Sequence, residues 1–156
     1  MSRAHGRKKI LAISSGGGHW VELLRLRPAL RGHHVVYVTV SPAYRDQVED
    51  APLWVIDDAT RWDRLGMLRV AAQILAIVLR ERPDVVVSTG ALPGFLGVLF
   101  GKRLLGAKTI WVDSLANAGE LSLSGRNARA HADLWLTQWP ELATPGGPRY
   151  LGSMLD

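Results

Sequence analysis

Short apolar runs alternate along the chain with longer segments that have helical spacing. Each run is five to seven residues long and is rich in Val, Ile, Leu and Trp. Runs of this length, bounded by Gly, Pro, Ser or charged residues, are typical of parallel strands that are buried on both faces. They predict six strands, at residues 9–14, 34–40, 53–57, 84–89, 108–113 and 133–138.

The segments between these runs predict four helices. One begins at His19 and ends near Pro28, and the others cover 64–82, 92–105 and a short stretch around 128–131. Strands that alternate with helices imply β-α units with parallel strands. The expected fold class is therefore α/β, with a doubly wound, mostly parallel sheet of the Rossmann-like type.

Two of these helices are more apolar than a surface helix requires. In 64–82 the polar residues Arg69, Gln73 and Arg80 form only a narrow stripe, and 92–105 is apolar up to its last turn. Either the sheet, other helices or a partner chain covers them, or an exposed part of them binds a bilayer surface. Because no run reaches about 18 uncharged apolar residues, we expect no membrane-spanning helix.

The composition fits a single globular domain over residues 1–156. With 156 residues, 47% of them hydrophobic, the chain can bury a core of its own but is too short for two full domains. The absence of cysteine excludes disulfides, thiol catalysis and cysteine-based zinc sites. No histidine or acidic pair has metal-ligand spacing, so we expect no metal and no tightly bound cofactor.

The net charge of +5 is concentrated at the N-terminus. Within the first nine residues, Arg3, Arg7, Lys8 and Lys9 contribute +4, which leaves +1 for the remaining 147. A body this close to neutral lacks the broad basic face of a duplex-binding protein, so no nucleic-acid partner is expected. Residues 1–7 are expected to form a flexible basic arm that can touch anionic lipid or phosphate. Since no apolar stretch of signal-peptide length follows, the expected location is the cytoplasm.

A turn of small residues follows the first predicted strand. It consists of Ser15, Gly16, Gly17 and Gly18, and His19 comes directly after it. In an open α/β sheet, ligands bind at the carboxyl ends of strands, where such a turn lets backbone N–H groups approach a phosphate. The turn matches neither GxGxxG nor GxxxxGKS/T, and no acidic residue ends the second strand. An NADP-type nucleotide-binding domain is therefore kept only as an alternative.

A second turn of small residues, with Thr89, Gly90 and Gly94, follows the fourth predicted strand, and Asp113 ends the fifth. Parallel strands end at one edge of a sheet, which predicts that His19, Thr89 and Asp113 surround one pocket. His19 is a candidate general base or phosphate ligand, or it only packs in the first turn of its helix. Asp113 is a candidate catalytic carboxylate, or it caps the following turn.

Four segments, in this order, resemble a known family of glycosyltransferase subunits: SSGGGHWVELLRL at 14–26, STGALPG at 88–94, GAKTIWVDSLANAGELSLSGR at 106–126 and ADLWLTQWPEL at 132–142. The chain is similar to the acceptor-side subunit of the two-component UDP-N-acetylglucosamine transferase of the dolichol pathway. It is more closely similar to the bacterial counterparts of that subunit, the PssD-like glucuronosyl- and galactosyltransferase subunits of exopolysaccharide synthesis. More distantly, it resembles the N-terminal half of the lipid II glycosyltransferase MurG.

The resemblance implies the N-terminal, acceptor-binding half of a GT-B glycosyltransferase that is split into two polypeptides. A partner subunit is then expected to bind the UDP-sugar, and the acceptor is a saccharide linked to a polyprenyl pyrophosphate. The transferred sugar would be glucuronosyl, galactosyl or N-acetylglucosaminyl. The chain would act peripherally at the inner face of the cell membrane. A non-catalytic scaffold that recruits the donor subunit is a further alternative.

The resemblance also implies roles for individual residues. His19 becomes a candidate base for the acceptor hydroxyl or a ligand of its pyrophosphate. Asp113 stands where many relatives have glutamate. The residues that match the acceptor loops are Ser15, Gly16, Gly17, Gly18, His19, Thr89, Gly90 and Gly94. The residues expected near the partner interface are Gln138, Trp139, Pro140 and Glu141.

Overall fold

The computed structural model of the chain describes residues 6–60 and 62–155. The expected basic arm, 1–7, lies outside the described residues except for Gly6 and Arg7. Within the described residues a seven-stranded sheet forms, and all neighbouring strands pair in parallel. The strands are β1 (Lys9–Ser14), β2 (His34–Thr39), β3 (Leu53–Val55), β4 (Val85–Gly90), β5 (Lys108–Val112), β6 (Leu134–Thr137) and β7 (Arg149–Tyr150).

The strand order is β3-β2-β1-β4-β5-β6-β7, so the sheet grows from β1 in one direction and from β4 in the other. This is the doubly wound, Rossmann-like fold that the sequence predicts, and its order reverses between β1 and β4. The helices are α1 (Gly18–Arg25), α2 (Arg27–Leu30), α3 (Arg64–Glu81), α4 (Leu92–Leu105) and α5 (Leu123–Ala128), with 3-10 turns η1 (Pro42–Gln47) and η2 (Pro140–Leu142).

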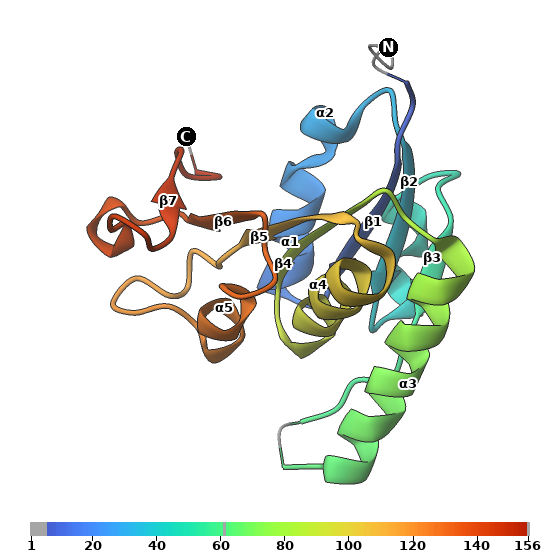
Figure 1. Cartoon of the computed structure of the whole chain (residues 1–156). Coiled ribbons are helices and arrows are strands. Elements are labelled where there is room, and N and C mark those ends of the chain that lie inside the picture. The colour runs from blue at the N-terminus through green and yellow to red at the C-terminus, as the bar shows by residue number, and fades with distance from the viewer. Residues whose placement is uncertain (1–5, 61, 156) are drawn as a thin grey trace.

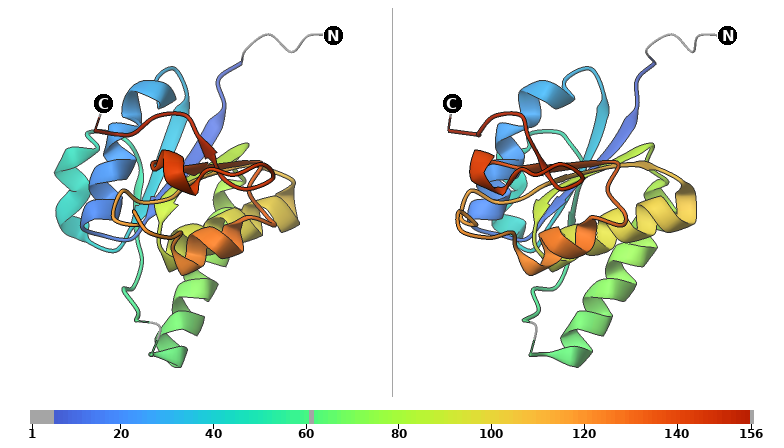
Figure 2. Two further views of the ribbon diagram at one scale, coloured as in Figure 1. Left: turned by 90° about the vertical axis from the view of Figure 1, so that its left-hand side faces the viewer. Right: turned by 60° about the vertical axis from the view of Figure 1, so that its left-hand side comes forward.

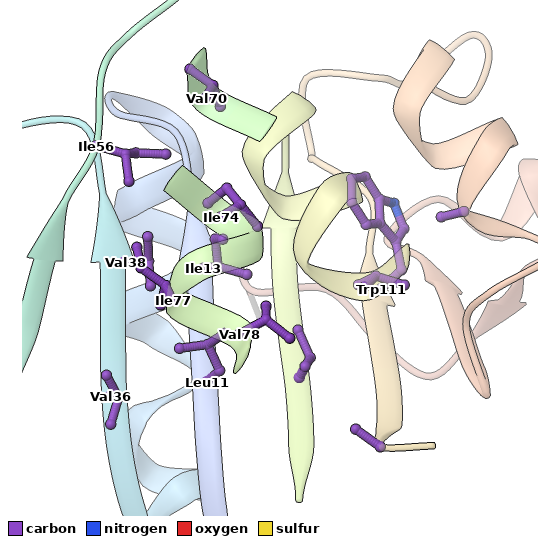
Figure 3. Packing of buried hydrophobic residues seen from close by; sticks show 14 residues of the cluster. Leu11, Ile13, Val36, Val38, Ile56, Val70, Ile74, Ile77, Val78 and Trp111 are labelled. Atoms are coloured by element: carbon purple, nitrogen blue, oxygen red, sulfur yellow. The ribbon is translucent and has the colours of Figure 1, made fainter. Parts of the chain in front are cut away.

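Helices cover both faces of the sheet, α1 on one side and α3, α4 and α5 on the other (Figures 1 and 2). Side chains of β1 alternate between the two layers. Leu11 and Ile13 join the cluster under α3 and α4, which Figure 3 shows, whereas Ile10 and Ala12 pack with Trp20 of α1. Because both faces are buried, the strands are nearly continuous apolar runs.

All six predicted strands are present, with ends that differ by no more than two residues. The helix expected around 128–131 lies earlier, at Leu123–Ala128, and residues 129–131 form a turn. It begins at Leu123 because Ser122 caps it and the Ser122 hydroxyl accepts from Gly125 N at 2.8 Å. The seventh strand, β7, was not predicted. It has only two residues, follows a Pro-Gly stretch and contains no apolar run. Neither hydrophobic periodicity nor composition therefore indicates a strand there.

The N-terminal part of α3 extends beyond the rest of the fold (Figures 1 and 2). The central residues Val70 and Ile74 are buried in the main core, whereas Leu65 and Leu68 are 76% and 66% exposed. The sheet and α4 therefore cover one face of this helix and leave leucines of its first turns exposed. None of the described helices combines the length and the apolar character that a membrane crossing needs.

Candidate functional site

The two glycine turns lie side by side at the point where the strand order reverses. The first follows β1, the second spans the end of β4 and the start of α4, and these two strands are direct neighbours. A hydrogen bond from Ser15 N to Gly90 O, at 3.2 Å, joins the two turns. In doubly wound sheets, the carboxyl edge at this reversal point is where ligands bind. The fold therefore brings the predicted turns together at the expected place.

His19 is held between the two turns by the residue that precedes Gly90. The His19 Nδ1 atom lies 3.0 Å from the carbonyl oxygen of Thr89, and the Thr89 hydroxyl donates to His19 O at 2.6 Å. A carbonyl oxygen only accepts, so Nδ1 carries the proton and Nε2 carries the lone pair. Nε2 has no hydrogen-bond partner within 6–60 and 62–155. This tautomer leaves Nε2 able to accept a proton.

The second turn needs glycine for close packing. The backbone of Gly90, at φ +133°, lies against the imidazole of His19. A Cβ at Gly94 would overlap the Ser88 hydroxyl, so a larger residue would push α4 away from β4. The second turn thus packs α4 closely on β4 and places the His19 ring against the edge of the sheet.

The N-terminus of α1 is open at this edge. Its N-cap is Gly17, at φ +64°, and no side chain caps the helix. Gly17 and Gly18 are exposed, and His19 is half-buried. An uncapped helix start presents N–H groups and a partial positive charge, which together suit a phosphate or another anion.

Asp113 lies at the same edge but is fully engaged inside the protein. Its carboxylate is 2% exposed and accepts from Trp111 Nε1 at 3.1 Å, from Ser122 N at 3.0 Å and from Ser122 Oγ at 2.6 Å. Gly125 packs directly on one carboxylate oxygen. Because both oxygens are occupied, Asp113 is better suited to fixing the start of α5 than to taking a proton from a substrate.

Glu22 has a role at this edge that the sequence analysis did not single out. It is 7% exposed and accepts from Ser114 Oγ at 2.9 Å, from Leu115 N at 2.8 Å and from Gln138 Nε2 at 2.7 Å. Glu22 therefore ties α1 to the segments that follow β5 and β6. Its position three residues after His19, on the same helix face, was the available sequence signal.

The segment expected at the partner interface is only partly accessible. Gln138 is buried and also donates to Asp113 O at 3.0 Å. Trp139 is half-buried and donates from Nε1 to Leu115 O at 2.9 Å, whereas Pro140 and Glu141 are exposed. Of the four residues, Pro140, Glu141 and part of Trp139 are open to another chain.

The shifted pKa values belong to groups away from this edge. Burial alone would raise the pKa of Asp133, but hydrogen bonds from Lys102 and Thr109 and the Lys102 charge hold it below its ordinary value. Burial and the nearby Arg103 guanidinium lower the pKa of His131. Among residues 6–60 and 62–155, no three His, Asp or Glu side chains cluster as metal ligands would.

Solved structures with the same architecture define the class of the domain. MurG from Acinetobacter baumannii superposes with a TM-score of 0.70 and 16% identity, over 90% of this chain and 44% of MurG. A UDP-N-acetylglucosamine 2-epimerase from Rickettsia bellii gives a TM-score of 0.64 and 16% identity, over 86% of this chain and 40% of the epimerase. The chain thus has the Rossmann-like fold of GT-B glycosyltransferases and spans less than half of these proteins.

Sequence comparison then defines the family. The chain is 31% identical to the UDP-N-acetylglucosamine transferase subunit ALG14 of Eremothecium gossypii, over 87% of this chain and 75% of that subunit. It is 25% identical to the ALG14 subunit of Mus musculus, over 86% of this chain and 76% of the relative. The chain therefore belongs to the ALG14 family of UDP-N-acetylglucosamine transferase subunits. No protein-family model matches it.

Proposed function

We propose that the chain is the acceptor-binding subunit of a two-subunit GT-B glycosyltransferase. A separate subunit holds the UDP-sugar, and the acceptor is a saccharide on a polyprenyl diphosphate. The observation that carries this proposal is the imidazole of His19, fixed by Thr89 O with its Nε2 lone pair free beside two joined glycine turns. The names of the related subunits, which are UDP-N-acetylglucosamine transferase subunits, support it.

In the proposed reaction, His19 acts as a general base. An acceptor hydroxyl attacks the anomeric carbon of the sugar, the bond from that carbon to the UDP oxygen breaks, and His19 Nε2 takes the hydroxyl proton. Configuration at the anomeric carbon inverts in this single displacement. The Thr89 carbonyl keeps the Nδ1 proton in place and stabilises the imidazolium that forms. The UDP leaving group is stabilised by the donor subunit.

The acceptor diphosphate is assigned to the two glycine turns and the open start of α1. The positions that would line it are Ser15, Gly16, Gly17 and Gly18 of the first turn. The buried residues of the second turn, Thr89, Gly90 and Gly94, would support it by placing His19 and α4. Exposed Gly17 and Gly18 let phosphate oxygens reach the first N–H groups of the helix. In this arrangement the phosphates lie next to the base, so the saccharide hydroxyl is held near Nε2.

The transferred sugar depends on the branch of the family. The names of the related ALG14 subunits favour N-acetylglucosaminyl transfer. The resemblance to the dolichol-pathway subunit favours a lipid-linked oligosaccharide as the product. The resemblance to bacterial PssD-like subunits favours a glucuronosyl or galactosyl donor in exopolysaccharide synthesis instead. Because the donor-binding residues are assigned to the partner subunit, transfer assays with several UDP-sugars decide between them.

Contact with the inner face of the cell membrane is assigned to the exposed apolar surface of α3 and α4. A groove of about 400 Å³ runs between these helices, lined by Arg64, Met67, Leu68, Ala71, Leu92 and Leu96. Leu68 in the groove and Leu65, which follows Arg64 in sequence, are exposed, and Arg64 adds a cation that suits anionic headgroups. The chain would therefore bind peripherally. The donor subunit would dock at Trp139, Pro140 and Glu141.

Sugar transfer in membranes tests the proposal. Membranes that contain this chain, the donor subunit or both are supplied with radiolabelled UDP-sugars and a lipid-linked acceptor. Transfer only with both chains supports a split transferase and identifies the sugar. Full activity with this chain alone contradicts the two-subunit proposal. Tight binding of NADP(H) by the chain, without transfer by the assembled pair, favours a nucleotide-binding domain instead.

A further inference from the structure

The hydroxyl of Tyr44 forms part of the wall of the first glycine turn. Tyr44 lies in η1, after β2, and its oxygen accepts from Gly17 N at 3.0 Å. Gly16 approaches the same hydroxyl so closely that a Cβ at this position would lie 3.2 Å from the oxygen. A side chain from a different part of the sequence therefore adds a polar group to the candidate acceptor site.

The phenol ring of Tyr44 is held in place by its neighbours. It stacks on the indole of Trp20, with ring centroids 4.9 Å apart and an angle of 11° between the planes. Trp20 is 1% exposed, and its Nε1 donates to Gln47 Oε1 at 3.0 Å, which links α1 to η1. Because the ring cannot swing freely, the hydroxyl is fixed beside the turn before any ligand arrives.

The proton of the Tyr44 hydroxyl is available to donate a hydrogen bond. Its oxygen accepts from Gly17 N, and its proton finds no acceptor within residues 6–60 and 62–155. A phenol donates one proton, and a phosphate oxygen is a charged group that only accepts. The proton is thus available to an anion at the turn, next to the N–H groups of exposed Gly18 and of His19.

We propose that Tyr44 is a binding residue for the acceptor and donates its hydroxyl proton to an oxygen of the diphosphate that links the saccharide to its lipid. The identity of the diphosphate rests on the proposed function. The UDP-sugar also carries a diphosphate, but it is assigned to the other subunit, whereas Tyr44 belongs to the wall of the acceptor turn. Tyr44 therefore acts on the affinity for the acceptor and not on the affinity for the donor.

A binding experiment on the full chain tests the hydrogen bond directly. Farnesyl diphosphate and inorganic pyrophosphate are titrated into wild-type protein, Tyr44→Phe and Tyr37→Phe, and the Gly17 and Gly18 amide resonances are followed by NMR. Tyr37 is a matched control, because its ring contacts the same Trp20 edge-on, at 5.8 Å, from within β2. Both variants keep their ring contacts with Trp20, and thermal unfolding verifies that they fold.

We expect Tyr44→Phe to bind both diphosphates about tenfold more weakly than wild type or Tyr37→Phe, as for loss of one hydrogen bond to a charged group. If Tyr44→Phe and wild type bind the diphosphates with equal affinity, the proposal is overturned. Tighter binding also overturns it, since the hydroxyl would then compete with the ligand for Gly17 N–H. The proposal is also wrong if wild-type protein binds neither diphosphate at millimolar concentrations.

Kinetics of the assembled pair distinguish the two diphosphates. Tyr44→Phe is expected to raise KM for the lipid acceptor about tenfold while KM for the UDP-sugar and kcat stay the same. A rise in KM for the UDP-sugar alone overturns the assignment to the acceptor. An inactive wild-type pair contradicts the proposed function, but leaves the diphosphate titrations valid as a test of Tyr44.

Discussion

Gly90 lies so close to His19 that residue 90 has no room for a side chain: a Cβ there would be 2.5 Å from Nδ1 and 2.6 Å from Cε1 of the imidazole. The φ of Gly90, +133°, is also one that other residues rarely adopt. The second glycine turn therefore sets the place of the candidate base, which comes from a strand-helix turn 70 residues earlier in the chain.

Replacement of Gly90 tests this contact. Gly90→Ala is expected to cost about 1–3 kcal/mol of stability through backbone strain, and to lower sugar transfer at least tenfold because the His19 ring must move. Gly32→Ala is the control, since Gly32 also has a positive φ, +84°, but nothing lies within 4 Å of its Cβ position. If both variants transfer sugar equally well, the contact with His19 has no role in the reaction.

Removal of the imidazole tests the base itself. His19→Ala is expected to lower the rate of transfer by the assembled pair about 10²- to 10⁴-fold, the usual contribution of a general base. Complex formation, measured by co-purification, should not change. His34→Ala, at the start of β2 and the opposite edge of the sheet, serves as the control. Normal transfer by His19→Ala would favour a scaffold over a catalytic subunit.

Loss of the buried carboxylate of Glu22 is expected to destabilise the fold. Glu22→Ala leaves the donors on Ser114, Leu115 and Gln138 without their acceptor, at a cost of about 3 kcal/mol, or roughly 10 °C in Tm. Glu120→Ala removes an exposed glutamate and should change stability by less than about 0.5 kcal/mol. Calorimetry of both variants checks the difference, and equal Tm values would contradict the importance of this network.

The proposed membrane surface makes a separate prediction. Leu68→Asp, in the groove between α3 and α4, is expected to weaken sedimentation with vesicles of anionic phospholipid at least tenfold, since burial of a leucine contributes about 1.5–3 kcal/mol. Leu104 is also exposed, but it lies at the far end of α4, outside the groove. Leu104→Asp should bind vesicles as wild type does, and a similar loss in both variants would argue against a defined surface.

Acid stability is expected to depend on Asp133. Its pKa is lowered in the folded protein, so its interactions stabilise the fold fully above the ordinary pKa of 3.8, and this stabilisation is lost as the pH falls through the lower folded value. Asp133→Asn should therefore make Tm depend less steeply on pH below about 4. Exposed Asp58 provides the control variant Asp58→Asn. Melting curves between about pH 7 and pH 2.5 measure both, and parallel curves for Asp133→Asn and wild type would contradict this role.

The sheet could be predicted from the sequence because its strands are buried on both faces. Runs such as Ile10 to Ile13 are apolar at every position, and their alternation with helices implies parallel order. The position of the two glycine turns followed from this, because parallel strands end at one edge. The short β7 and the early start of α5 could not be predicted, since hydrogen bonds such as that from Gly125 N to Ser122 Oγ define them.

Side-chain partners in the candidate site were less predictable than their location. The sequence placed His19, Thr89 and Asp113 at one edge, but only His19 and Thr89 are joined there, whereas Asp113 binds Ser122. Glu22 looked like an ordinary polar position between Val21 and Leu23. Its three donors are 92, 93 and 116 residues away, and local patterns carry no information about such distant partners.

One face of α1 carries His19, Glu22 and Arg25, spaced three residues apart, and their partners come from progressively later parts of the chain. The last of these partners is the carbonyl of Met154, which accepts from Arg25 at 2.8 Å, 129 residues away. During synthesis, α1 is made before these partners and cannot complete its contacts until residue 154 has left the ribosome. The packing of α1 is thus expected to be completed only after residue 154 has emerged, with the slow folding typical of distant contacts.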